Sequence, residues 1–90
     1  MSANSPLRPE FSWDVHSGQY VLYATILGQS VQLASIYYDL DSGLYSWWFK
    51  NAQTRSNGDS ASPDDAVKTM RALVPAGFGT EVVPDIPVQP

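Results

Sequence analysis

The chain has 90 residues, with 9 acidic and 5 basic side chains, a net charge of −4 and no cysteine. This length fits one domain with one modest core, and no segment approaches the run of about 20 apolar residues that a membrane-spanning helix needs. The lack of cysteine excludes disulfides, thiolate metal sites and cysteine nucleophiles. We therefore expect a small acidic cytoplasmic domain that has no cofactor and no membrane contact.

Four strands are predicted after a leader, residues 1–9, which has no hydrophobic period and is expected to be disordered. The strand segments are rich in Tyr, Trp, Val and Ile: Glu10–His16, Gln19–Leu27, Ser30–Tyr38 and Leu44–Lys50. The predicted turns between them are Ser17-Gly18, Gly28-Gln29 and the loop Asp39–Gly43. Short turns of this kind join neighbouring antiparallel strands, so the sequence predicts a β-meander.

The predicted turns fix a register that gathers apolar residues on one face. It places Ala24 opposite Leu33, and Tyr37 opposite Tyr45. The face expected to pack in the core then holds Phe11, Trp13, Val15, Tyr20, Leu22, Ala24, Ile26, Val31, Leu33, Tyr37, Tyr45, Trp47 and Phe49. A slip of one residue at any turn would scatter this set over both faces. The agreement between the turns is the main support for the meander.

One helix is predicted after a polar loop, Asn51–Ala61. Ser62 is a favourable N-cap, and Pro63 suits the first helical position. The expected buried stripe follows a helical period: Ala66, Val67, Met70, Leu73 and Val74. Pro75 ends the helix. The predicted fold is α+β, with a four-stranded antiparallel β-meander, one C-terminal helix packed on one face, a domain spanning residues 10–75, and flexible termini.

The C-terminal residues 76–90 are predicted to be a proline-rich tail. Pro84, Pro87 and Pro90 favour an extended chain over a helix or a central strand. The segment is either a loose end or a peptide that docks on a partner or on its own domain through apolar side chains: Val82, Val83, Ile86 and Val88.

The residues that are candidates for catalysis or metal binding are explained better by ordinary structural roles. His16, the one histidine, is predicted beside Asp14 on an open edge strand, where an ordinary surface histidine is expected. Asp39, Asp41 and Asp59 could suggest an oxygen cage, but Asp39–Gly43 lacks the spacing and the final Glu of a calcium loop, and a turn explains these residues. We therefore expect no enzyme activity and no metal site.

The second face of the predicted sheet is unusually apolar. One helix covers only one face of a sheet, and the uncovered face of an antiparallel sheet is usually polar. This second face holds Val21, Tyr23, Thr25, Gln32, Ala34, Ile36, Tyr38, Leu44, Ser46, Trp48 and Lys50. Such patches mark interaction surfaces, and Trp and Tyr are favoured anchors. The residues predicted to bind a partner are Tyr23, Trp48, Tyr38, Ile36, Val21 and Leu44. Alternatively, the tail folds back over this face through Phe78, Val82, Val83 and Ile86.

The occupant of this face is predicted to be a protein of unknown identity or, alternatively, a second copy of the chain forming a homodimer. Sheet-borne aromatic residues also bind single-stranded nucleic acid. That function needs a basic groove, whereas this region offers only Lys50 and Arg55, so a nucleic-acid partner is disfavoured. Imitation of nucleic acid by the carboxylates stays open, although they are scattered over turns and a helix start.

The aromatic and glycine positions, together with the predicted helix start, have a recognisable order: Trp13, Gly18, Tyr20, Ala24, Ile26, Gly28, Asp41, Gly43, Tyr45, Trp47, Phe49, Ser62, Asp65 and Ala66. Over residues 11–74, this order resembles small uncharacterised phage, prophage and bacterial proteins with a Trp-rich β-meander closed by one helix. The resemblance implies an accessory protein that binds and modulates a host protein, acting in the host cytoplasm. It implies no catalytic residue.

Overall fold

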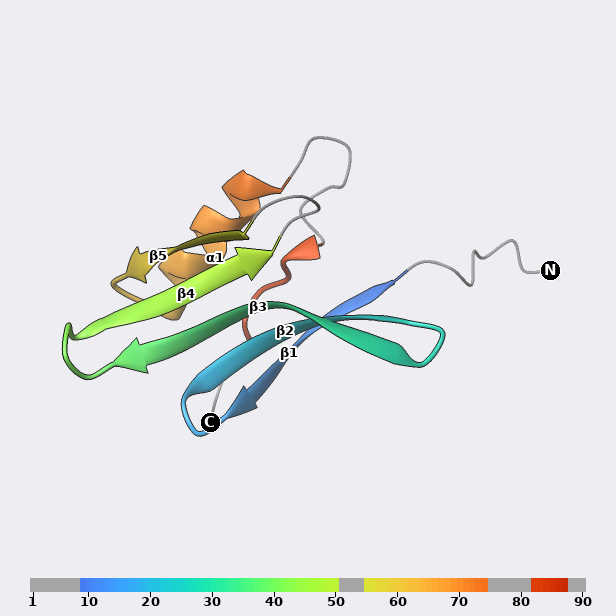
Figure 1. The fold of residues 1–90 in the computed structure, drawn as a ribbon, viewed down its shortest axis with the longest axis horizontal. Helices are drawn as coiled ribbons and strands as arrows, with labels where there is room; N and C mark the ends of the chain where they lie inside the picture. Colours follow the sequence, from blue (N-terminus) through green and yellow to red (C-terminus); the bar gives the residue numbers. More distant parts are fainter. Residues whose placement is uncertain (1–8, 51–54, 75–81, 88–90) are drawn as a thin grey trace.

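Figure 1 shows the computed structural model of the chain, in which residues 9–50, 55–74 and 82–87 are described. These residues form five strands and one helix: β1 (Glu10–His16), β2 (Gln19–Ile26), β3 (Gln29–Asp39), β4 (Leu44–Lys50), β5 (Arg55–Ser60) and α1 (Pro63–Leu73). The strands form one antiparallel sheet in the order β1-β2-β3-β4-β5. The predicted α+β meander with a C-terminal helix is confirmed, with five strands in place of four.

Two tight turns connect the first three strands. Ser17 and Gly18 have φ angles of 50° and 80°, and Leu27 and Gly28 have φ angles of 53° and 80°. Positive φ at both positions matches the twist of a hairpin and favours glycine. The first turn and the register between β1 and β2 are as predicted. The second turn lies one residue earlier than predicted. Its first residue is Leu27, which adopts a positive φ that leucine rarely takes, so the sequence does not favour this position.

A β-bulge in β3 changes which side chains face the core. Tyr23 lies opposite Gln32 and Leu22 lies opposite Ala34, which leaves Leu33 without a pairing partner on β2. One extra residue in a strand reverses the alternation of all side chains beyond it. The second half of β3 is therefore turned over relative to the regular register that the sequence predicts.

The reversal corrects the predicted positions of four residues. Ala34 and Ile36, predicted on the outer face, are each 0% exposed in the core. Tyr38, also predicted there, lies on the core side opposite Tyr45, and the two rings make an edge contact with centroids 5.2 Å apart. Tyr37, predicted in the core, lies on the outer face and is 46% exposed.

The pairing of β3 with β4 continues one residue further than predicted before the chain turns. Asp39 lies opposite Leu44, and the Gly43 N–H donates to the Asp39 carbonyl at 2.8 Å. The Asp39 carboxylate also accepts from the Asp41 N–H at 2.9 Å. This additional pair offsets the bulge. The core side of β4 therefore carries the predicted residues: Tyr45, Trp47 and Phe49.

The strand β5 lies in a segment whose polar composition predicts a loop, so that prediction is wrong. Gly58 lies opposite Trp47 of β4, and the Trp47 Nε1 donates to the Ser60 Oγ at 3.1 Å. An aromatic ring over a strand glycine stabilises pairing. The strand is thus held by its neighbour rather than by its own β-propensity.

A methyl group at Gly58 is expected to destabilise the protein. A Cβ atom there would lie 3.0 Å from Cζ2 of Trp47, and that indole has little room to move because it is 6% exposed. We expect Gly58→Ala to lower the free energy of unfolding by about 1–3 kcal/mol in urea denaturation. In a Trp47→Leu background the same change should cost less than about 0.5 kcal/mol. An equal cost in both backgrounds would mean that the ring is not the obstacle.

The helix α1 has the predicted start and the predicted buried stripe. The Ser62 Oγ accepts from the Asp65 N–H at 3.1 Å and caps the helix, with Pro63 in the first turn. The buried side carries Ala66, Val67 and Met70, with Leu73 and Val74 partly buried. The helix packs against β4 and β5, so it leaves the core side of β1 and β2 to another segment.

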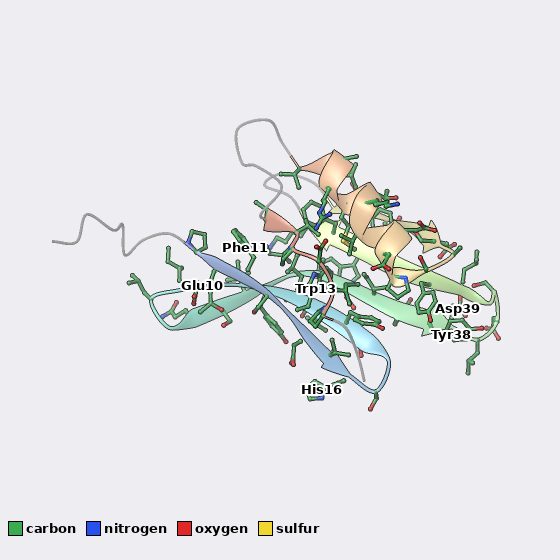
Figure 2. All side chains as sticks on the ribbon, turned by 180° about the vertical axis from the view of Figure 1, so that it is seen from behind. Glu10, Phe11, Trp13, His16, Tyr38 and Asp39 are labelled. Carbon is green, nitrogen blue, oxygen red and sulfur yellow. The ribbon has the colours of Figure 1, made fainter. Side chains whose placement is uncertain are left out.

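Residues 82–87 lie on the same side of the sheet as α1 (Figure 2). Val83 is 0% exposed in the core. The Trp13 Nε1 donates to the Pro84 carbonyl at 2.7 Å, and the Arg71 Nε donates to the Val83 carbonyl at 2.8 Å. The Arg71 Nη2 also pairs with the Asp85 Oδ1 at 2.6 Å. This segment, called the strap below, joins β1 to α1.

The strap distinguishes the alternatives for the tail. Its apolar residues Val82, Val83 and Ile86 pack on the core side of the sheet, so they dock on their own domain and do not cover the opposite face. The predicted leader residues 1–8, Phe78 and Val88 lie outside the described residues.

Candidate interaction surface

The outer face is the side of the sheet opposite α1 and the strap. Its side chains alternate with those of the core along each strand: Asp14 and His16 of β1, Val21 and Tyr23 of β2, Ser35 and Tyr37 of β3, Leu44, Ser46 and Trp48 of β4, and Asn57 and Asp59 of β5. No other described element lies over this face (Figures 1 and 2). It is the face of the sheet that the described part of the chain leaves uncovered.

The outer face retains only part of the predicted partner-binding set. Val21, Tyr23, Leu44 and Trp48 lie on it as predicted. Ile36 is in the core and Tyr38 is on the side of α1. The predicted placement of these two residues on the outer face is wrong, because the bulge in β3 reverses the strand between Val21 and Trp48.

The retained residues form a centre and a separate corner. Val21 and Trp48 lie in one cross-strand row on either side of Ser35, which is 2% exposed and accepts from the Gln19 Nε2 at 3.4 Å. Leu44 lies about 13 Å from Trp48 along β4, given the rise of a strand residue. The outer face is therefore more polar in the middle than predicted, with aromatic side chains around a buried hydroxyl.

An open hollow of about 290 Å³ lies on the outer face across β3, β4 and β5. It is lined by Tyr37, Ser46, Trp47, Trp48, Asn57, Gly58 and Asp59. The Ser46 Oγ donates to the Asp59 Oδ1 at 2.9 Å. Trp48 and Tyr37 thus stand beside a strip of polar groups that includes one carboxylate.

Sequence reasoning missed Tyr37, Asn57 and Asp59 as members of this surface. The regular register places Tyr37 in the core, and the polar composition of residues 51–61 predicts a loop for the other two. The one sequence signal for β5 is the alternation of small and polar residues along Ser56–Ser60. That signal is weak because the segment contains no β-branched or aromatic residue.

The other polar candidates have local structural roles. The His16 Nε2 lies 3.3 Å from the Asp14 Oδ2, with side chains 81% and 54% exposed on the edge strand. Asp39 holds the turn between β3 and β4, where the Ser42 Oγ accepts from the Leu44 N–H at 3.2 Å. These groups lie on an open edge and in a turn, and they do not converge on one reacting position.

Among the described residues, no group of three or more His, Cys, Asp or Glu side chains is placed to hold a metal ion. The helix α1 has 11 residues, which is too short to cross a membrane. The described residues contain no helix that is both long enough and apolar enough to do so. Comparisons of the chain with protein-family profiles, with curated proteins and with solved structures give no match.

Proposed function

We propose that this chain is a non-enzymatic protein-interaction module that binds a protein partner through its outer face. The observation that supports the proposal is the position of Tyr23, Tyr37 and Trp48 on a face that no described element covers. Tyr37 and Trp48 are diagonal neighbours across β3 and β4, and apolar surface that a small protein leaves uncovered marks interaction sites. Trp and Tyr side chains supply much of the binding free energy in protein interfaces.

The resemblance to small phage and prophage proteins makes a host protein the proposed partner. We place the interaction in the cytoplasm, because a chain without cysteine does not depend on an oxidising compartment. The exposed Asp14–His16 pair supports binding rather than catalysis, since it lies in no water-excluding site. A protein partner is favoured over single-stranded nucleic acid because Asp14 and Asp59 lie on the same face as Lys50.

Tyr37 and Tyr38 offer a matched test of which face binds. They are consecutive tyrosines, 46% and 47% exposed, on opposite sides of β3. We expect the photoreactive residue benzoylphenylalanine to crosslink one host protein from position 37 in a host-cell lysate, and not from position 38. Equal crosslinking from the two positions would contradict binding through the outer face.

The crosslinked protein, once purified, allows the contribution of Trp48 to be measured. We expect Trp48→Ala to weaken its binding about 30-fold in isothermal titration calorimetry, as for truncation of an aromatic anchor worth about 2 kcal/mol. Tyr38→Ala is the control and should leave the affinity unchanged, and circular dichroism checks that both variants fold. An unchanged affinity of a folded Trp48→Ala variant would exclude the outer face. Light scattering tests the alternative occupant, which is a second copy of the chain. If the protein is a dimer in solution and Trp48→Ala makes it monomeric, a second copy occupies the outer face in place of a host protein.

A further inference from the structure

The hollow on the outer face has aromatic side chains at two diagonal corners. Tyr37 lies opposite Ser46, and Trp48 lies opposite Ser35, so each ring has a small hydroxyl residue as its cross-strand neighbour. Diagonal neighbours on one face of an antiparallel pair are about 7–8 Å apart. Between the two rings, the hollow lies against Ser46, which is one of its lining residues, whereas Ser35 is 2% exposed and does not line it.

Asp59 supplies the negative charge of this hollow. Its Oδ1 accepts from the Ser46 Oγ at 2.9 Å, which orients the carboxylate. An ionised carboxylate has about four acceptor positions, so Asp59 keeps the capacity to accept from a ligand. Asp39 adds negative potential at the same end of the sheet. Lys50 lies beyond Trp48 along β4, on the side away from Asp59, so the positive charge is directed to the opposite end.

Two aromatic rings and a carboxylate around one hollow suit a guanidinium group. A guanidinium is planar, stacks on aromatic faces and donates two parallel hydrogen bonds to a carboxylate. A cation within about 6 Å of a ring centroid is attracted by the ring. An anion would be repelled by Asp59, and an aliphatic group would cover the carboxylate without offering a donor.

We propose that the hollow between Tyr37 and Trp48 receives an arginine side chain of the protein partner, with Asp59 as its counter-ion. The inference rests on the proposed function and names the residue that the partner must present. It also follows the net charge of −4, because an acidic chain selects basic surfaces through long-range attraction.

The probe is the peptide acetyl-Gly-Gly-Arg-Gly-Gly-amide, compared with the same peptide carrying citrulline, a neutral isostere of arginine. We expect the arginine peptide to shift the amide NMR signals of Tyr37, Ser46, Trp48 and Asp59, with a dissociation constant on the order of 10 mM for a single side chain. The citrulline peptide should shift these signals far less. Equal shifts with the two peptides would overturn the proposal.

Two variants that remove the same charge locate the effect. Asp59→Asn retains an oxygen that can accept from Ser46, and Asp41→Asn removes a carboxylate from the exposed turn at the same end of the sheet. We expect Asp59→Asn to weaken binding of the arginine peptide about fivefold, as for loss of one exposed ion pair. Asp41→Asn should weaken it less than about twofold, because exposed charges are screened. Equal weakening by the two variants would overturn the assignment of Asp59.

The protein crosslinked at position 37 separates this inference from the proposed function. If its binding is lost in Trp48→Ala and unchanged in Asp59→Asn, the arginine assignment is wrong and the proposed function stands. If the arginine peptide occupies the hollow but no protein crosslinks through position 37, the proposed function fails and the chemistry of the hollow stands.

Discussion

Ile36→Ala is expected to lower the free energy of unfolding by about 3 kcal/mol in urea denaturation. Ile36 is 0% exposed in the core, and its truncation leaves a cavity that the surrounding side chains fill incompletely. Tyr37→Ala, at the next position, is expected to cost less than about 1 kcal/mol, because the Tyr37 side chain is 46% exposed on the outer face.

The comparison of these two variants is a direct test of the bulge at Leu33. A regular register through β3 would reverse the ranking, because it places Tyr37 in the core and Ile36 outside. If Tyr37→Ala is the more destabilising variant, the bulge is absent. The slope of the denaturation curve should be the same for both variants, which establishes that they unfold from equally compact states.

Val83→Asp is expected to detach the strap and to lower the free energy of unfolding by about 2 kcal/mol. Val83 is 0% exposed, and full burial of a valine contributes roughly 1.5–3 kcal/mol. A carboxylate at this position would have to leave the core, because an unpaired buried charge is costly. We expect the sheet to stay folded when the strap leaves, so that the loss is limited to the free energy with which the strap docks.

A chain truncated after residue 81 should therefore lose the same stability as Val83→Asp. In both variants the indole of Trp13 loses the Pro84 carbonyl and gains contact with water, so the tryptophan fluorescence should shift to longer wavelength. Asp85→Asn is the control: it should cost less than about 0.5 kcal/mol and leave the fluorescence unchanged, because the ion pair of Asp85 with Arg71 is exposed and exposed pairs contribute little. A much larger loss in Val83→Asp than in the truncated chain would contradict the separate docking of the strap.

The elements that the sequence predicts correctly have strong local signals. Ser17-Gly18 specifies a hairpin turn regardless of distant packing, and Ser62-Pro63 specifies a helix start. Leu27-Gly28, like Ser17-Gly18, has glycine at the second position of the turn. From the sequence, however, Gly28-Gln29 is the favoured turn, because leucine rarely adopts the positive φ that the first position of the observed turn requires. Local chemistry therefore decides the outcome only where the residue suits the backbone it must adopt.

The bulge and β5 depend on interactions between strands. Leu33 and Ala34 are both apolar, so the alternation of β3 can begin a core-facing series from either residue. Burial of Ile36 between Tyr20 and Trp47 selects the bulged register, and this preference exists only once the sheet forms. Similarly, β5 is a strand because Trp47 covers Gly58, a relation that the sequence of β5 does not contain.

The candidate site was predictable to the extent that its strands were regular. Trp48 and Tyr23 lie on strands whose faces the turns specify, and both are on the outer face as predicted. Tyr37 comes after the bulge, and Asp59 lies on β5, where the sequence predicts a loop. The hollow is built from these last two residues and Trp48, so it became visible only with the three-dimensional arrangement.

The hydrogen bond between Trp13 and Pro84 spans 71 positions of the chain, and this has a consequence for biosynthesis. During translation every strand leaves the ribosome before the strap does. The indole of Trp13 therefore lacks its hydrogen-bond acceptor, the Pro84 carbonyl, while the sheet assembles. Contacts of such long sequence separation form late and slow the final closure. The nascent protein therefore passes through a stage in which the core side of β1 and β2 is not yet covered by the strap and is accessible to chaperones.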